Sequence, residues 1–373
     1  MILILLAGLL FFLLYCGHTY YYRRRWKENF QVDIGFSENQ AGEGDQLFLY
    51  ETAVNNKKMK LPVLCVKFQA SKYLRFEDTD SGSVSDYYYR NDVMSVDGFQ
   101  KVRRKLRFTC KKRGLYQIQE AELVSYDLFC THTFAHKKTV QASLCVYPSR
   151  IDIQRLLPVF RHMTGGLVTP VPLYEDPYAY AGVRAYTPQD SMRRIHWKAS
   201  ARTGQWQVKT TEYQAGAPVV ILLNLESPGV FTDMDLMEDS IRLAYSFIYY
   251  LSKNGIPTRL VAGGEEMVRL EGNGQEQLAA VRHALAVISY KNVCCNGLEL
   301  LAGEAEKLRP DTHVIFISPA GKMPLQQAVT GILRKGVPVT WVAPMITENG
   351  ADSEFREVSP GLEKCLIKWG GAG

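Results

Sequence analysis

Residues 218–225 read PVVILLNL, an apolar run in which Asn224 is the one polar side chain. A strand without polar alternation is buried on both faces, which is typical of a parallel sheet covered by helices. Downstream of it, further apolar runs alternate with amphipathic segments as far as residue 345. This rhythm predicts a doubly wound α/β domain over residues 217–345 and a C-terminal tail over residues 346–373. The predicted strands are residues 218–225, 256–262, 312–318 and 337–343, and the predicted helices are residues 234–253, 275–288, 297–308 and 325–335.

An all-β pattern precedes this domain. Residues 47–54 and 61–68 are rich in apolar and β-branched side chains. In residues 101–110, apolar side chains at positions 102, 106, 108 and 110 alternate with basic side chains at positions 101, 103, 105 and 107. That period of two predicts a half-buried strand with a cationic outer face. We therefore expect an all-β sandwich-like domain over residues 30–147.

The N-terminal residues 1–22 carry no charged side chain. As a helix rising about 1.5 Å per residue, such a segment is long enough for a hydrocarbon layer of about 30 Å. It is followed by Arg23, Arg24 and Arg25, which favour the cytoplasmic side. A cleaved signal peptide is the alternative, but basic residues do not precede the apolar run and a small-residue cleavage site does not follow it. We predict a single-pass transmembrane helix over residues 1–22, in the cell membrane, with the folded domains in the cytoplasm.

Charge and cysteine content agree with that placement. The 373 residues carry a formal net charge of +6, which is mildly basic and does not by itself indicate nucleic-acid binding. None of the eight cysteines forms a C-x-x-C pair or has zinc-type spacing with histidine. Scattered thiols of this kind are typical of a reducing compartment. The aromatic residues after the apolar run, from Tyr15 to Trp26, are typical of the membrane interface.

Two segments link the predicted domains. Residues 148–182 hold five prolines, and we expect a connector with little regular structure. Residues 183–216 form a segment dense in arginine, lysine and tryptophan. Its candidate interaction residues are Arg184, Tyr186, Asp190, Arg193, Arg194, His196, Trp197, Lys198, Ser200, Arg202, Lys209 and Glu212.

These residues allow more than one interpretation. In a structural one, Asp190 pairs with Arg193 or Arg194, Trp197 packs under the α/β domain, and the other charged residues tie the connector to it. In a functional one, the exposed basic residues bind an anion or an acidic partner, and arginine with tryptophan forms an interaction hot spot. A catalytic interpretation makes Asp190, His196 and Ser200 a hydrolytic triad. The spacing disfavours it, because Asp190 lies six positions from His196, and a G-x-S-x-G elbow is missing from the sequence.

The spacing of this segment resembles the signature of the domain of unknown function 58 family. The matching pattern runs from Arg184 through Asp190 and Trp197 to Arg202, and the Lys112-Arg113-Gly114-Leu115-Tyr116 turn in the β-rich region also fits. The resemblance implies a membrane-bound bacterial or archaeal protein with an α/β domain similar to von Willebrand factor A domains. It also implies genes for a MoxR-type AAA+ ATPase and a transglutaminase-like membrane protein nearby. The resemblance implies no particular catalytic activity, because none is assigned to the family in general.

A von Willebrand-type domain often holds a metal ion after its first strand, at a D-x-S-x-S pattern. The matching positions here are Asn224, Glu226 and Pro228, and Pro319 stands where a later aspartate is expected. Too few oxygen ligands converge for a hard cation such as Mg²⁺. We therefore expect a degenerate site without metal, and no cofactor, since a Walker lysine and a G-x-G-x-x-G loop are also missing from the sequence.

These observations favour a non-enzymatic, membrane-anchored cytoplasmic adaptor. By resemblance its partners are the MoxR-type ATPase and the transglutaminase-like membrane protein. One alternative is a hydrolase that uses Asp190, His196 and Ser200. A second is nucleic-acid or anionic-lipid binding through residues 101–113. Nucleic acid is not expected, because base stacking needs exposed aromatic rings and the nearby Phe108 is predicted to point inward.

Overall fold

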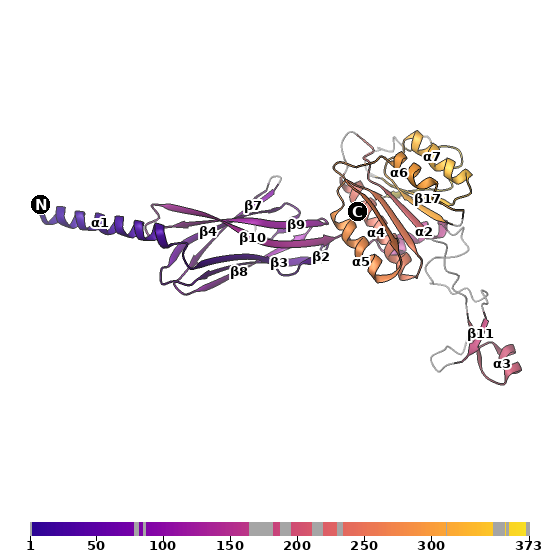
Figure 1. The fold of residues 1–373 in the computed structure, drawn as a ribbon, viewed down its shortest axis with the longest axis horizontal. Coiled ribbons are helices and arrows are strands. Elements are labelled where there is room, and N and C mark those ends of the chain that lie inside the picture. Colours follow the sequence, from indigo (N-terminus) through magenta and orange to yellow (C-terminus); the bar gives the residue numbers. More distant parts are fainter. Residues whose placement is uncertain are drawn as a thin grey trace. The chain divides into compact units, whose positions relative to one another are not determined.

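The chain forms two compact units, residues 1–149 and residues 150–373, and each is described by itself. We analysed a computed structural model (Figure 1). Its described residues are 2–77, 82–84, 87–163, 182–186, 195–210, 219–229, 234–310, 312–345, 355 and 358–370.

The first unit begins with helix α1 (Ile2–Arg25), which is longer than the predicted 1–22. From Ile4 to Leu14 its side chains are exposed, and the helix is long and apolar enough to cross a membrane. Its last turns differ from the expectation of an interfacial aromatic belt. Tyr22 and the following Trp26 are buried in the core of the β-rich part, and Tyr20 and Tyr21 remain exposed. The helix therefore continues into the folded unit without a free linker.

Two sheets enclose the core of this unit, which confirms the predicted β-rich domain. The four-stranded sheet has the order β1-β3-β8-β5 and the six-stranded sheet the order β2-β10-β9-β4-β7-β6. The pattern in residues 101–110 is observed as expected, with Leu106 and Phe108 inside and the basic side chains outside. The strands are β1 (Phe30–Phe36), β2 (Gln40–Gly42), β3 (Gln46–Asn55), β4 (Leu61–Ser71), β5 (Leu74–Phe76), β6 (Gly82–Val84), β7 (Tyr87–Val96), β8 (Lys101–Cys110), β9 (Gly114–Tyr126) and β10 (Thr133–Tyr147).

The second unit contains the α/β sheet, in the order β15-β14-β13-β16-β17-β18. Its pairs are parallel except for β14 with β15, which is antiparallel. Both faces of β13 are buried, as its sequence predicts. Val219, Ile221 and Leu223 share one core with α2, α4 and α5, whereas Val220 and Leu222 share another with α6 and α7 (Figure 1).

The central elements of this unit follow the predicted order, and α2, β15 and β18 are added to them. The strands are β13 (Val219–Asn224), β14 (Thr258–Gly263), β15 (Met267–Gly272), β16 (His313–Ile317), β17 (Val339–Met345) and β18 (Leu366–Gly370). The helices are α2 (Ile153–Met163), α4 (Met234–Lys253), α5 (Gly274–Val287), α6 (Gly297–Ala305) and α7 (Met323–Arg334).

Two predicted boundaries are wrong. The connector 148–182 contains α2, whose Leu156, Val159 and Phe160 are buried in the α/β core, so part of it belongs to the domain. The prolines of this segment indicated irregular structure, so the helix was not predicted. The helix nevertheless accommodates Pro158. The tail 346–373 contributes β18, which pairs with β17, and Leu362, which is fully buried. Both segments cover apolar surface that the sheet and its central helices would otherwise expose to water.

A buried charge cluster lies in the first unit. The Arg90 guanidinium donates to both Asp92 carboxylate oxygens, at 2.8 and 2.7 Å, and both side chains are fully buried. Burial, and then the charge of Asp92, raise the pKa of Glu51 to about 9. Glu51 is therefore neutral in the folded protein near pH 7, because burial and the charge of Asp92 disfavour its carboxylate more than Arg104 and Arg90 favour it.

We expect this unit to lose stability as pH rises from about 5 to about 9. The pKa of Glu51 is raised from 4.5 to about 9 in the fold, so the unfolded chain releases this proton first and becomes favoured. Glu51→Gln should flatten the dependence, which amounts to about 1.4 kcal/mol per pH unit between the unfolded and the folded pKa. Thermal unfolding of the full-length protein in detergent across this pH range measures how stability depends on pH. Asp33→Asn, at an exposed position of β1, is the control, and equal slopes for the two variants would contradict the assignment.

Removing the Phe160 ring should destabilise the α/β unit by about 3–5 kcal/mol, because it leaves a cavity in a packed core. The ring is fully buried and meets Phe247 of α4 edge to face, with centroids 5.4 Å apart. The denaturation midpoint of Phe160→Ala, compared with that of the exposed control Gln154→Ala, measures the effect. Similar midpoints would mean that α2 is not part of the core.

Candidate functional site

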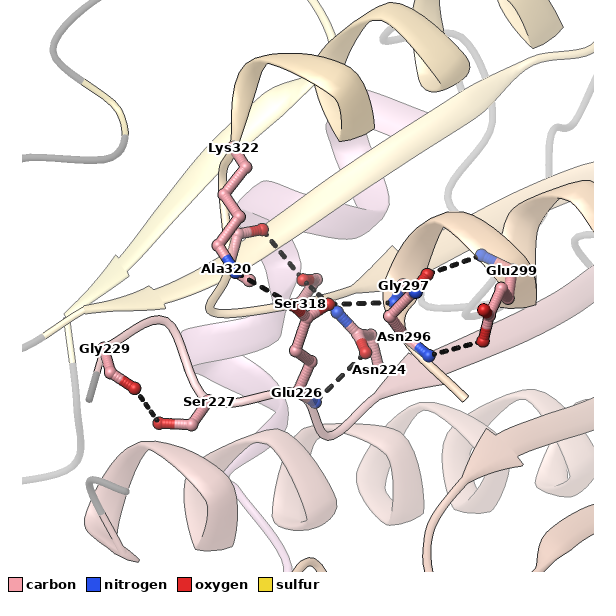
Figure 2. A network of polar contacts seen from close by, with 10 residues as sticks. All are labelled: Asn224, Glu226, Ser227, Gly229, Asn296, Gly297, Glu299, Ser318, Ala320 and Lys322. Atoms are coloured by element: carbon pink, nitrogen blue, oxygen red, sulfur yellow. Dashed lines mark hydrogen bonds and ion pairs between the residues drawn. The ribbon is translucent and has the colours of Figure 1, made fainter. Parts of the chain in front are cut away.

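The centre of the α/β sheet supplies the first candidate site. Strand β13 has β14 on one side and β16 on the other, so the chain leaves β13 and β16 in opposite directions. In open α/β sheets, ligands bind at such a switch point, outside the carboxyl ends of the strands. Asn224 ends β13 and Ser318 directly follows β16. We call the surrounding set Asn224, Glu226, Gly297, Ser318 and Lys322 the switch-point network (Figure 2).

Asn224 organises the buried part of this network. Its side-chain amide donates to the Ser318 hydroxyl at 2.9 Å, and its side-chain oxygen accepts from the Glu226 amide at 3.1 Å. Ser318 in turn donates to the Ala320 carbonyl at 2.9 Å. A Cβ on Gly297 would lie 2.5 Å from the Asn224 amide nitrogen, so the first residue of α6 has to be glycine. These contacts fix the backbone after β13 against the start of α6.

The Glu226 carboxylate closes the network on its outer side. One oxygen accepts from the Gly297 amide at 3.0 Å, and the other forms an ion pair with the Lys322 ammonium at 3.0 Å (Figure 2). The amide belongs to the N-terminal turn of α6, where partial positive charge favours an anion. The same turn is capped by a reciprocal pair of hydrogen bonds between Asn296 and Glu299. The negative charge of Glu226 is therefore balanced by two groups of the same chain, the Gly297 amide and the Lys322 ammonium.

The positions predicted as a degenerate metal site fit a hard cation poorly. Asn224 offers an amide oxygen that already accepts from a backbone N–H, and Pro228 has no side-chain ligand. The Glu226 carboxylate is matched by an ammonium ion. A six-coordinate ion such as Mg²⁺ needs several free oxygens. The described residues contain no group of three or more histidine, cysteine or acidic side chains that could hold a metal ion.

The signature segment supplies the second candidate site. Strand β11 (Gly182–Ala185) pairs antiparallel with β12 (Gln207–Thr210), and helix α3 (Trp197–Thr203) lies between them in the chain. Ile195 and Val208 are buried and bridge each other, which gives the hairpin a small core. Arg184 pairs in register with Val208, and Lys209 with Val183. We call this set of elements the signature hairpin.

His196 and Ser200 have structural partners in the signature hairpin. The His196 ring nitrogen Nδ1 accepts from the Ala199 amide at 3.0 Å and caps α3. The Ser200 hydroxyl donates to the His196 backbone carbonyl at 3.1 Å and accepts from the Gln207 amide at 2.9 Å. These contacts join α3 to β12. They favour the structural interpretation of both residues over the triad interpretation.

The outer surface of the signature hairpin is rich in aromatic and basic groups. Trp197 is 68% exposed, which differs from the expectation that it packs under the α/β domain. Trp206, which sequence reasoning did not select, is 49% exposed and meets the Tyr186 ring with centroids 5.4 Å apart. Lys198 and Arg202 of α3 are exposed as well. The predicted Asp190, Arg193, Arg194 and Glu212 lie outside the described residues.

The basic strand of the first unit has aromatic neighbours that the sequence interpretation missed. Phe48 and Tyr50 lie on the outer face of β3, which pairs with β8. The Lys105 ammonium lies 3.6 Å from the Phe48 ring centroid, and the Arg103 guanidinium carbon lies 3.8 Å from the Tyr50 centroid. The expectation that Phe108 is the nearby aromatic was therefore incomplete. Alternation along β3 could have revealed these rings, but the pairing of β3 with β8 could not be read from the sequence.

Comparison with solved structures gives weak similarities. A non-cellulosomal cohesin from the archaeon Archaeoglobus fulgidus is 13% identical over 31% of this chain and 91% of its own, with a TM-score of 0.23. The seventh ScaB type I cohesin from Pseudobacteroides cellulosolvens is 13% identical over 33% of this chain and 94% of its own, with a TM-score of 0.21. None of the curated proteins matches the chain.

A family match covers the signature hairpin and the first part of the α/β sheet. Residues 182–308 match the family described as "Protein of unknown function DUF58". The matched range contains β11, α3 and β12, and it continues through β13 to α6. It therefore includes Trp197 and Glu226 from the two candidate sites. The resemblance to the DUF58 family that the signature segment indicated is therefore confirmed for residues 182–308.

Proposed function

We propose that this protein is a non-enzymatic adaptor, anchored in the cell membrane by α1, that binds a protein partner through the signature hairpin. The folded units face the cytoplasm in this proposal. The observation that carries it is the exposure of Trp197 beside Lys198 on a folded element. The proposed partner is a MoxR-type AAA+ ATPase, with a transglutaminase-like membrane protein as a further component, as the family resemblance implies.

Helix α1 supports the anchor. Its apolar side chains from Ile4 to Leu14 are exposed and would meet water in the absence of a bilayer. Burying each large apolar side chain in lipid is favourable by about 1.5–3 kcal/mol. Arg23, Arg24 and Arg25 end the helix, and basic residues at such an end favour the cytoplasmic side.

The signature hairpin supports the partner surface. None of the residues of α3 is buried, so the helix has no side chain packed into a core of its own. Tryptophan and arginine are the residues that most often dominate the binding energy of protein interfaces. An exposed Trp197 next to Lys198 and Arg202 is therefore suited to an acidic partner surface with an apolar centre.

The switch-point network supports a role without metal or catalysis. We propose that the α/β domain is similar to von Willebrand factor A domains, in which this place often holds a cation. Here the Lys322 ammonium compensates Glu226 instead. Such a domain would act as a rigid support that presents the signature hairpin to the partner.

Replacing Trp197 with alanine should weaken binding of the MoxR-type ATPase at least about tenfold, because truncating a hot-spot tryptophan costs roughly 2 kcal/mol or more. Affinity is measured between the purified ATPase and the full-length protein in nanodiscs. Val287→Ala, at an exposed apolar position of α5, is the matched control. Equal affinity for wild type and Trp197→Ala would remove Trp197 from the interface. Failure of the wild type to bind would remove the ATPase as partner.

The wild type should bind no Mg²⁺ at millimolar concentrations, because the Glu226 carboxylate is already paired with Lys322. Isothermal titration of the full-length protein with MgCl₂ measures this. Lys322→Ala removes the ammonium partner of Glu226 and tests whether this ion pair is what excludes Mg²⁺. Lys335→Ala, at an exposed lysine after α7, is its control. Saturable binding by the wild type would contradict the proposal of a metal-free domain.

A further inference from the structure

The β9–β10 loop, residues 127–132, lies against helix α1. The Phe129 ring meets the Tyr15 ring with centroids 5.6 Å apart, and it meets the His18 ring edge to face at 5.4 Å. The Tyr15 hydroxyl is 2.8 Å from the Thr131 hydroxyl. The loop and the helix are thus in direct contact at the side chain that follows the apolar run.

The loop extends along α1 toward the N-terminal end of the helix. At the base of the loop, the Ser125 hydroxyl lies 2.7 Å from the hydroxyl of Tyr22, and this contact is buried. At the tip, Phe129 contacts Tyr15, which precedes Tyr22 by seven residues. Seven helical residues correspond to a rise of about 10 Å. The loop therefore points toward the part of α1 that is most apolar.

The tip of the loop exposes large apolar side chains. Leu128 is 60% exposed and Phe129 is 45% exposed. If Arg23 lies at the edge of the hydrocarbon layer, Tyr15 lies about 12 Å deeper, because eight residues of helix separate them. A loop in contact with Tyr15 then has to enter the membrane as well. Its exposed leucine and phenylalanine have the chemistry for that environment.

Several polar groups of the loop are bonded within the loop. The Asp127 side chain is buried and accepts from the Thr131 amide at 2.7 Å and from the Thr131 hydroxyl at 2.8 Å. It also lies 3.3 Å from His132 Nδ1, and the Cys130 amide donates to the Asp127 carbonyl at 3.0 Å. Backbone outside regular structure is tolerated at membrane depth when its polar groups are bonded within the protein. The Asp127 side chain and the amides of Cys130 and Thr131 meet this condition, while the side chains of Leu128 and Phe129 are exposed.

We propose that Leu128 and Phe129 form a second membrane contact, inserted beside α1 into the acyl-chain region of the same bilayer leaflet. This inference rests on the proposed function, in which α1 spans a bilayer. The partner that covers the apolar loop tip is the lipid that surrounds α1. The contact fixes the first unit on the membrane surface at two points, so that the unit cannot rotate freely about the helix axis.

Native Cys130, which is exposed next to Phe129, reports on this contact, and Cys294, which is exposed in the other unit, is the internal standard. The full-length protein is placed in nanodiscs of phosphatidylcholine and phosphatidylglycerol and treated with a water-soluble maleimide. Peptide mass spectrometry gives the labelling rate of each cysteine. We expect the rate ratio of Cys130 to Cys294 to be at least about tenfold lower in the wild type than in Leu128→Asp/Phe129→Asp, because burial of two large apolar side chains holds the tip in lipid.

Leu115→Asp is the matched control. Leu115 is equally an exposed leucine, at the opposite end of β9, eleven residues before Tyr126. The Cys130 to Cys294 labelling ratio of the Leu115→Asp variant should equal that of the wild type. The added aspartates near Cys130 disfavour the thiolate and would by themselves slow its labelling, so a faster reaction in the double variant reports release from lipid.

The outcomes separate this inference from the proposed anchor. Protein that does not co-elute with nanodiscs would overturn the membrane anchor itself. Protein that co-elutes, with the same labelling ratio in the wild type and the double variant, would overturn the loop contact alone. If the aspartates disturb β9 and β10, Phe129→Trp gives a second measurement: lipids brominated on the acyl chain should quench its added fluorescence, and lack of quenching would overturn the contact.

Discussion

The burial of β13 on both faces is the constraint on which the second unit depends. Its odd and even residues belong to two separate cores, so helices have to cover each face of the sheet. Parallel neighbours on both sides then force the chain to leave β13 and β16 in opposite directions. This geometry places Asn224 and Ser318 side by side, at the one end of the sheet where helix N-termini converge. The polar network around them follows from the topology, and its residues determine what that place can bind.

The first unit depends on a different kind of constraint, the burial of Tyr22 and Trp26. An apolar helix joined to a domain by a free linker leaves the domain mobile relative to the membrane. Here the last turns of α1 are part of the β core, and Lys57 contacts the backbone carbonyls of Trp26 and Glu28. The orientation of the β sheets is therefore coupled to the orientation of the helix. In the proposed membrane anchor, the tilt of the helix would be transmitted to the β sheets of this unit.

The sequence predicted those elements whose apolar pattern is complete within one segment. Strand β13, helix α4 and the alternation in β8 were of this kind, and their boundaries match within one residue. Helix α2 and strand β18 were missed because their apolar side chains complete a core formed by distant residues. For residues 183–216, the charge and aromatic content left a structural and a functional interpretation open. The hydrogen bonds of His196 and Ser200 depend on the pairing of β11 with β12, which local spacing does not reveal.

The switch-point network shows how the positive group at a site determines which ligands that site can bind. A divalent cation such as Mg²⁺ binds several oxygens and usually keeps water ligands that another oxygen ligand can replace. The Lys322 ammonium carries one charge and is already paired with Glu226, whose other oxygen is held by the N-terminal turn of α6. An incoming carboxylate would have to displace Glu226 from both partners, which costs the two interactions it replaces. In the proposed function, binding therefore takes place through other surfaces, and the exposed Trp197 and Trp206 of the signature hairpin are the candidates.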